Sequence, residues 1–242
     1  MTGTLINTAT VVLGTLAGRL VGERLPVRIQ ETQMAVIGLI TLALGAHNAL
    51  SVFAPGHPSN EFLAALLALL VGGWVGEALG LDERINALGR VAEARFTKQD
   101  GSSGEGDFAR AFVTTSILFC VGPLTVLGCF DDGLNGDIRK LVVKSVLDGV
   151  SSAAFAAALG WGVLLSAGTV FFVQGALTFA AGLLRPVLSD AMVSAMTGAG
   201  GVLLLGLGLN LLGVTKIRTA SLLPALVLAP FFWRLLHAFS VN

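Results

Sequence analysis

The sequence predicts an all-α polytopic membrane protein, a helical bundle of about eight transmembrane spans. Of its 242 residues, 54% are hydrophobic and only 12% are charged, and the mean hydropathy is +0.83. Apolar stretches close to the roughly 20 residues that cross a hydrocarbon core recur along the whole chain. The apolar composition predicts a lipid bilayer around the protein, and the net charge of zero gives no reason to expect a nucleic-acid partner.

Eight apolar stretches are long enough to be spans. In chain order they are residues 4–21, 35–53, 62–81, 109–130, 141–159, 163–184, 190–214 and 222–239. The fourth is interrupted by Gly122 and Pro123, since proline removes a hydrogen bond from the helical ladder. Only a short turn separates the fifth span from the sixth, and the count falls to seven if either does not cross fully.

Two of these spans carry glycines at every fourth position. They are Gly14, Gly18 and Gly22 in the first span, and Gly72, Gly76 and Gly80 in the third. A stripe of small residues lets a neighbouring helix approach closely. We expect these faces either to pack inside the chain or to join protomers, so a homo-oligomer through glycine-rich faces is one prediction of the sequence.

The only long hydrophilic segment divides the chain. We interpret residues 1–96 as a first transmembrane unit, 97–107 as a flexible cytoplasmic linker rich in glycine and serine, and 108–242 as a second transmembrane unit. With eight spans and both termini outside, most lysines and arginines fall in cytoplasmic loops. The positive-inside rule therefore predicts an external N-terminus.

Two similar segments predict an internal repeat. Aligning Gly38 with Gly200 places GLITLALGAHNAL over GGVLLLGLGLNLL and pairs Asn48 with Asn210. Spans one to three then correspond to spans six to eight in inverted orientation, as in inverted-repeat transporters. In such a repeat, Asn48 and Asn210 are expected to meet near the midplane.

The fifth span contains charges that need a partner or a function. Lys144 and Asp148 are one helical turn apart, so their side chains share a face and can neutralise each other. Asp148 lies roughly 12 Å into the bilayer at about 1.5 Å per residue. A charge at that depth costs on the order of 2.5–3.5 kcal/mol and often marks an ion or substrate path. A pair that only locks helix packing is the alternative.

Other polar residues of the spans complete the predicted binding site. They are Ser145, Ser151 and Ser152 in the fifth span, Asn48 in the second, Gln174 in the sixth and Asn210 in the seventh. Their oxygens suit a hard cation, and a cation or proton that displaces Lys144 from Asp148 would make the pair a coupling site. For each amide or serine alone, a hydrogen bond between helices is the alternative.

The loop 131–137 contains three carboxylates, but their spacing does not match a calcium-binding loop. We expect this loop to cap the fifth helix, with an acidic vestibule that attracts cations as the alternative.

Several short elements together resemble one known family. They are Asp132-Gly133-Leu134, Gly136-Asp137, Lys144-Ser145, Asp148-Gly149, Gln174-Gly175 and Gly208-Leu209-Asn210. Over nearly its whole length the chain is similar to the bacterial membrane proteins of domain of unknown function 554, the YdfK-like proteins. Cys129-Phe130 stands where that family often has a smaller pair. The resemblance implies a multi-pass protein of the prokaryotic cytoplasmic membrane and implies no particular substrate.

These features predict an integral membrane transporter or channel for a small ion or solute. Asp148 is the only deep aspartate, and the histidines form no H-E-x-x-H motif. Intramembrane enzymes need paired aspartates, an activated nucleophile or a metal motif, so we expect no enzymatic activity, no cofactor and no metal. A membrane scaffold or sensor subunit that transports nothing is the alternative.

Overall fold

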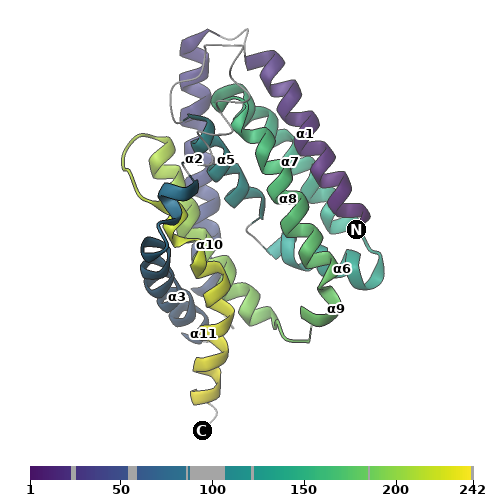
Figure 1. The fold of residues 1–242 in the computed structure, drawn as a ribbon, viewed down its shortest axis with the longest axis vertical. Coiled ribbons are helices and arrows are strands. Elements are labelled where there is room, and N and C mark those ends of the chain that lie inside the picture. Colours follow the sequence, from purple (N-terminus) through teal and green to yellow (C-terminus); the bar gives the residue numbers. More distant parts are fainter. Residues whose placement is uncertain are drawn as a thin grey trace. The chain divides into compact units, whose positions relative to one another are not determined.

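The computed structural model describes residues 1–22, 26–53, 59–85, 87, 107–120, 123–184 and 186–240. Within these residues the chain is helical and contains no strand (Figure 1). The prediction of an all-α fold is confirmed.

The helices follow the predicted spans closely. The long ones are α1 (Thr2–Gly22), α2 (Val27–Leu50), α3 (Ser59–Ala78), α7 (Arg139–Leu159), α8 (Gly162–Phe179), α10 (Asp190–Leu211) and α11 (Pro224–Ser240). The shorter ones are α5 (Asp107–Cys120), α6 (Pro123–Asn135), α9 (Ala181–Leu184) and the 3-10 helices η1 (Ser51–Phe53) and η2 (Thr219–Leu222).

Seven stretches of the described chain are helical, long and apolar enough to cross a membrane, and α5 with α6 would supply an eighth. This pair is bent by 59° between Cys120 and Leu124. Pro123 is the first residue of α6, where a missing backbone N–H costs the helix no hydrogen bond. Gly122 lies outside the described residues.

The chain forms two compact units. Unit 1 comprises Met1–Ile37, Arg84–Cys120 and Leu124–Leu184, and unit 2 comprises Gly38–Glu83, Val121–Pro123 and Arg185–Asn242. These units differ from the predicted halves 1–96 and 108–242, because α1 packs with α7 and α8, whereas α3 packs with α10 and α11. The predicted linker lies outside the described residues up to residue 106, and Asp107 begins α5.

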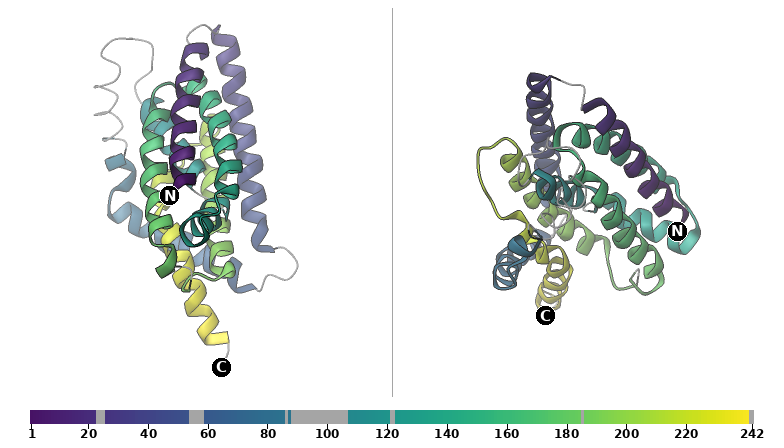
Figure 2. Two further views of the ribbon diagram at one scale, coloured as in Figure 1. Left: turned by 90° about the vertical axis from the view of Figure 1, so that its right-hand side faces the viewer. Right: turned by 45° about the horizontal axis from the view of Figure 1, so that its top comes forward.

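In unit 1, α1 and α7 run parallel and side by side (Figures 1 and 2). A Cβ atom on Gly18 would lie 2.1 Å from the Ala153 carbonyl oxygen, and one on Gly22 would lie 2.6 Å from that of Ala157. Only glycine permits backbones to come this close. The glycine stripe of the first span therefore packs inside the chain.

The parallel direction of α1 and α7 bears on the number of crossings. Two spans that run the same way through a membrane are separated by an odd number of crossings. Between α1 and α7 lie two candidate crossings, α2 and α3. The bent pair α5–α6 is the described segment that can supply the third, which favours eight spans over seven.

In unit 2, α3 and α11 run antiparallel and side by side (Figure 2, right). A Cβ atom on Gly72 would lie 2.6 Å from the Ala225 nitrogen, and one on Gly76 only 1.8 Å from the Ser221 carbonyl oxygen. The third span's stripe is thus covered within the chain at these two positions. An oligomer stays a prediction, and it would have to use surfaces other than the covered glycines of either stripe.

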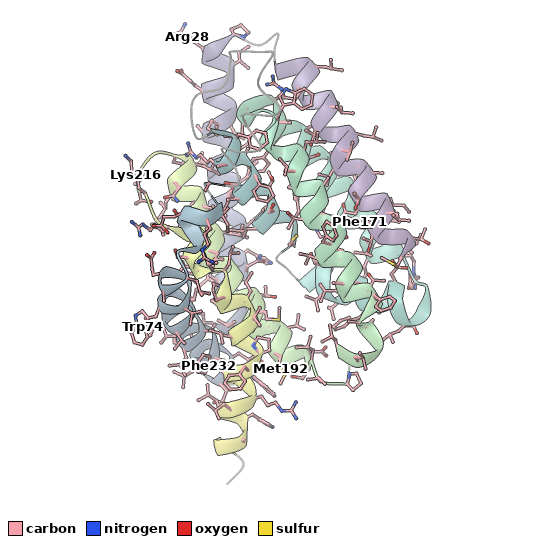
Figure 3. The ribbon with its side chains drawn as sticks, viewed as in Figure 1. Arg28, Trp74, Phe171, Met192, Lys216 and Phe232 are labelled. Carbon is pink, nitrogen blue, oxygen red and sulfur yellow. The ribbon has the colours of Figure 1, made fainter. Side chains whose placement is uncertain are left out.

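Trp74 of α3 projects away from the packed face of that helix (Figure 3). Its exposed fraction is 74%. Large apolar side chains on such an outward face are what a helix presents to lipid.

The three helix pairs that the predicted repeat relates are α1 with α8, α2 with α10, and α3 with α11. Each of these pairs packs antiparallel, as the contacts of their glycines and threonines show. A twofold axis in the membrane plane would impose this relation. The inverted repeat nevertheless stays a prediction, since antiparallel neighbours are also common in bundles without one.

Candidate intramembrane site

The polar face of α7 is turned into unit 1. Its buried residues include Leu141, Lys144, Ser145, Asp148 and Ser152. The opposite face consists of Val143, Val146, Leu147 and Val150, all more than half exposed. A helix that hides its charges and exposes its aliphatic side chains has the pattern expected in lipid, where the surroundings are less polar than the bundle interior.

Lys144 and Asp148 form a buried ion pair across one turn of α7. Their side chains are only 7% and 9% exposed. The Lys144 ammonium donates to Oδ2 of Asp148. The pair has no net charge, which lowers the cost of keeping both groups away from water.

Asn7 of α1 joins this pair. Its side-chain amide donates from Nδ2 to the same Asp148 Oδ2 at 2.9 Å, and its own Oδ1 is buried without a hydrogen-bond partner in the described part of the chain. Asn7 reaches Asp148 because the glycine face of α1 lies directly on α7. Asn7 precedes Gly14 by two turns and belongs to the same face of α1, and this periodicity could have identified it in the sequence.

Gln174 of α8 contributes a second amide to the same region. Its side chain is 0% exposed, and neither Oε1 nor Nε2 has a hydrogen-bond partner among the described residues. A buried amide without partners is unusual, because an unmet donor or acceptor costs about 1–3 kcal/mol.

The packing of α8 on α1 places Gln174 at the level of Asn7. One turn on one side of Gln174, the Thr178 hydroxyl lies 3.3 Å from that of Thr4. One turn on the other side, Val170 shares a hydrophobic cluster with Val11. On α1, Asn7 lies between Thr4 and Val11, so the two amides occupy the same intervening turn of the interface.

These groups lie near one end of the spans. Asn7 and Lys144 each lie five residues from the start of their helices, and Gln174 lies five residues before the end of α8. At about 1.5 Å per residue this corresponds to about 7.5 Å in each helix. Because α1 and α7 are parallel and α8 is antiparallel to α1, the starts of α1 and α7 and the end of α8 lie at the same end of unit 1. The three residues therefore lie at about the same depth from that end.

Two of the three predicted serines of α7 bond to their own helix. The Ser145 hydroxyl donates to the Leu141 carbonyl at 2.6 Å, and the Ser152 hydroxyl donates to the Gly149 carbonyl at 2.8 Å. Ser151 is half-buried. The Ser145 and Ser152 hydroxyls keep acceptor lone pairs, but their donors are already used within the helix.

The two predicted asparagines of unit 2 do not meet. In the antiparallel pair α2–α10, a Cβ on Gly201 would touch the backbone of Asn48 and lie 2.2 Å from the Ala49 nitrogen. Asn210 lies nine residues further along α10, about 13 Å away along its axis. The expectation that they meet is wrong. In an antiparallel pair of helices, the point where the helices cross decides which residues are in contact, and similarity of sequence does not.

Asn210 has a local function instead. Its Nδ2 donates to the Ile217 carbonyl at 2.7 Å, and its Oδ1 accepts from the Ile217 amide at 2.8 Å and from the Thr215 hydroxyl at 3.1 Å. The side chain thereby holds the loop that follows α10. Asn48 and Asn210 belong to unit 2 and the Lys144–Asp148 pair to unit 1, so a site that combines both sets stays a prediction.

The carboxylates near the start of α7 each bind a basic group. Asp131 accepts from Lys140 at 2.5 Å, and Asp137 accepts from Arg139 at 2.5 Å. Hydrogen bonds from the Arg139 guanidinium and amide lower the pKa of Asp137 to about 2. These acids are therefore neutralised locally, which weakens the alternative of an open acidic vestibule.

Asp132 binds the start of α1, a contact that the sequence did not indicate. Its carboxylate accepts from the Met1 ammonium at 2.9 Å and from the Gly3 amide at 3.1 Å. A carboxylate at a helix N-terminus satisfies amides that have no partner within the helix. Asp132 thus fixes the end of α1 that carries Asn7.

Taken together, the fold and the site define a polytopic helical membrane protein with a buried ion pair and two buried amides in one of its helical units. Within the described residues no three His, Cys, Asp or Glu side chains form a group that could hold a metal ion.

Comparison with known proteins identifies the family. The chain belongs to the family of the protein of unknown function DUF554, whose model matches residues 2–234. It is 29% identical over 242 residues, the full length of both chains, to the uncharacterized membrane protein YdfK of Bacillus subtilis strain 168. It is 31% identical over 227 residues, 94% of each chain, to the uncharacterized protein YqgA of Escherichia coli K12. No solved structure matches the chain. The resemblance inferred from the sequence elements is confirmed.

Proposed function

We propose that the protein is a transporter or channel for a small ion or solute and that the polar cluster of unit 1 is its functional centre. The proposal depends on one observation, a buried Lys144–Asp148 pair that is joined by Asn7 and lies at the level of the unpartnered Gln174. Polar groups that only held helices together would be expected to satisfy one another. Here at least three amide atoms remain without partners in the described part of the chain.

The pair has properties that suit transport. Lysine carries its charge on a flexible four-carbon stem, so the ammonium can move while α7 stays in place. Separating the pair leaves a carboxylate in a region of low dielectric, where it attracts any cation or proton that can enter. This chemistry needs no covalent step, no cofactor and no resident metal, and we propose that the protein is not an enzyme.

We propose the prokaryotic cytoplasmic membrane as its location, with the N-terminus outside. The distribution of lysine and arginine over the loops of the sequence supports this orientation.

A membrane scaffold or sensor subunit without transport is the second candidate. It is favoured by the fact that Lys144 and Asp148 lie on the same helix and bond directly to each other. Such a pair can stabilise the packing of α1 on α7 without ever opening.

Flux measurements separate the two candidates. Purified full-length protein in proteoliposomes would be tested with 22Na⁺, 86Rb⁺, 36Cl⁻ and an internal pH-sensitive dye for protons. Transport predicts flux above that of empty liposomes and its loss in Asp148→Asn. The matched control is Ser166→Ala, which removes a buried hydroxyl of α8 that bonds, among the described residues, only to the Val163 carbonyl of its own helix. If no probe moves faster than in empty liposomes, the scaffold or sensor candidate is favoured.

A further inference from the structure

We propose that the polar cluster of unit 1 binds a monovalent alkali-metal cation, with Asp148, Asn7 and Gln174 as ligands and with Lys144 as a tethered competitor. This inference rests on the proposed function and names the class of ion that the site takes.

The cluster contains oxygens that nothing in the described part of the chain occupies. Both hydrogen bonds to Asp148 fall on Oδ2, which leaves Oδ1 available. Asn7 uses its Nδ2 on Asp148, so the group it has left is the Oδ1 acceptor. Gln174 adds Oε1 from the facing helix. One carboxylate and two amide oxygens are the kind of hard ligands that alkali and alkaline-earth cations prefer.

The charge of the cluster selects a monovalent ion. With Lys144 in place, one positive and one negative group are buried together. Exchange of the ammonium for Na⁺ or K⁺ keeps this region neutral, whereas a divalent ion would leave one uncompensated positive charge. An uncompensated charge is strongly unfavourable in a region of low dielectric.

Lys144 is placed so that it can leave. It lies one helical turn closer to the start of α7 than Asp148 does, and its stem can extend toward that end of the span. Asp148 has a short side chain and cannot follow. The displaced ammonium would then face the membrane surface, and Asp148 with the two amides would be open to a cation.

The role of Gln174 distinguishes this site from an ion pair that is merely structural. A structural pair does not need a fully buried amide on α8 without hydrogen bonds. A cation held by Asp148 and Asn7 would give the Gln174 oxygen, which has no hydrogen-bond partner among the described residues, a group to bind.

Equilibrium binding of 22Na⁺ and 86Rb⁺ to the purified full-length protein in detergent tests the inference. Unlabelled Na⁺, K⁺ and Li⁺ serve as competitors, and choline serves as the cation that these oxygens cannot coordinate closely. We expect saturable binding of at least one probe that choline does not displace. Lys144→Met should tighten this binding at least about tenfold, because the tethered competitor is gone.

The ligand variants complete the test. Gln174→Leu should weaken binding about tenfold, the loss expected for one ligand of a small site, and Ser166→Ala should leave it unchanged. The double variant Lys144→Met/Asp148→Asn should bind neither probe. Because it removes both charges, it should still fold, which its thermal midpoint and gel-filtration profile would verify.

The inference is overturned if neither probe binds saturably to the wild type or to Lys144→Met, or if Gln174→Leu binds as tightly as the wild type. Its failure differs from that of the proposed function. Binding as expected without flux in proteoliposomes would retain the cation site and refute transport. Flux of another probe that depends on Asp148, without cation binding, would retain transport and refute the cation site.

Discussion

Replacing Gly18 with alanine should loosen the packing of α1 on α7. The added Cβ would lie 2.1 Å from the Ala153 carbonyl oxygen, whereas ordinary van der Waals contacts of a Cβ begin at 3.4 Å. The difference, 3.4 − 2.1 = 1.3 Å, must come from movement of whole helices, because the obstructing atom belongs to the backbone. One turn away on either side, a Cβ on Gly14 or on Gly22 would also meet the α7 backbone, at 2.2 Å and 2.6 Å, so the movement cannot stay local.

The expected size of the effect follows from two opposing terms. Forcing an extra methyl into a well-packed contact costs up to about 3 kcal/mol. Alanine instead of glycine within a helix returns up to about 1 kcal/mol. We therefore expect Gly18→Ala to lower the free energy of unfolding by about 2 kcal/mol.

Unfolding in mixed detergent, followed by circular dichroism, would measure this change. The matched control is Gly168→Ala in α8, where an added Cβ meets no atom of another described helix within 4 Å. This control should be neutral or stabilising by up to about 1 kcal/mol. Equal stability of Gly18→Ala and the control would refute the packing of α1 on α7. If Gly18→Ala kept its stability but lost an oligomer seen for the wild type, the stripe would join protomers instead.

Three further perturbations have defined outcomes. Lys144→Met or Asp148→Asn alone should lower the free energy of unfolding by about 3–5 kcal/mol, because each leaves one buried charge without its partner. The double variant should return to within about 1 kcal/mol of the wild type. A double variant destabilised by the sum of the two single effects would contradict a coupled pair. Asn210→Ala removes three hydrogen bonds of the loop after α10 and should speed cleavage of that loop by a protease in detergent; unchanged cleavage would mean that other contacts hold the loop. The pKa of Asp137 is about 2 in the folded protein, below its ordinary value of 3.8, so its pairing with Arg139 stabilises the fold above pH 4 and is lost as the pH falls through about 2. The thermal midpoints of the wild type and Arg139→Gln should therefore converge at acid pH. A difference between the midpoints that grows at acid pH would contradict a stabilisation that is lost when Asp137 is protonated.

Much of the candidate site could be read from the fifth span. Lys144 and Asp148 are i and i+4 on a helix, and this spacing alone brings them together whatever surrounds the helix. Asn7 could have been included, because it lies on the same face of its span as the glycines that allow close contact. Gln174 was predicted as one of the polar residues of the binding site. Its lack of partners could not be predicted, since that depends on every neighbour around it.

The pairing of Asn48 with Asn210 shows where sequence similarity failed. Similar segments predict similar local structure, but contacts in an antiparallel pair depend on where the helices cross. The glycine stripes were likewise ambiguous between contacts inside the chain and contacts between protomers. Their pattern indicates that another helix can approach closely, but it does not identify that helix.

By itself, the sequence determined that the chain is a bundle of membrane-spanning helices and that one span carries a self-compensating charge pair. Both depend on periodicities within a single helix, where residues three or four positions apart always share a face. Only the tertiary structure decided that α1 lies parallel on α7, that Asn7 bonds to Asp148, and that Gln174 is buried at the same level. These contacts join residues far apart in the chain, and the backbone approaches that select them become visible only when the helices are packed.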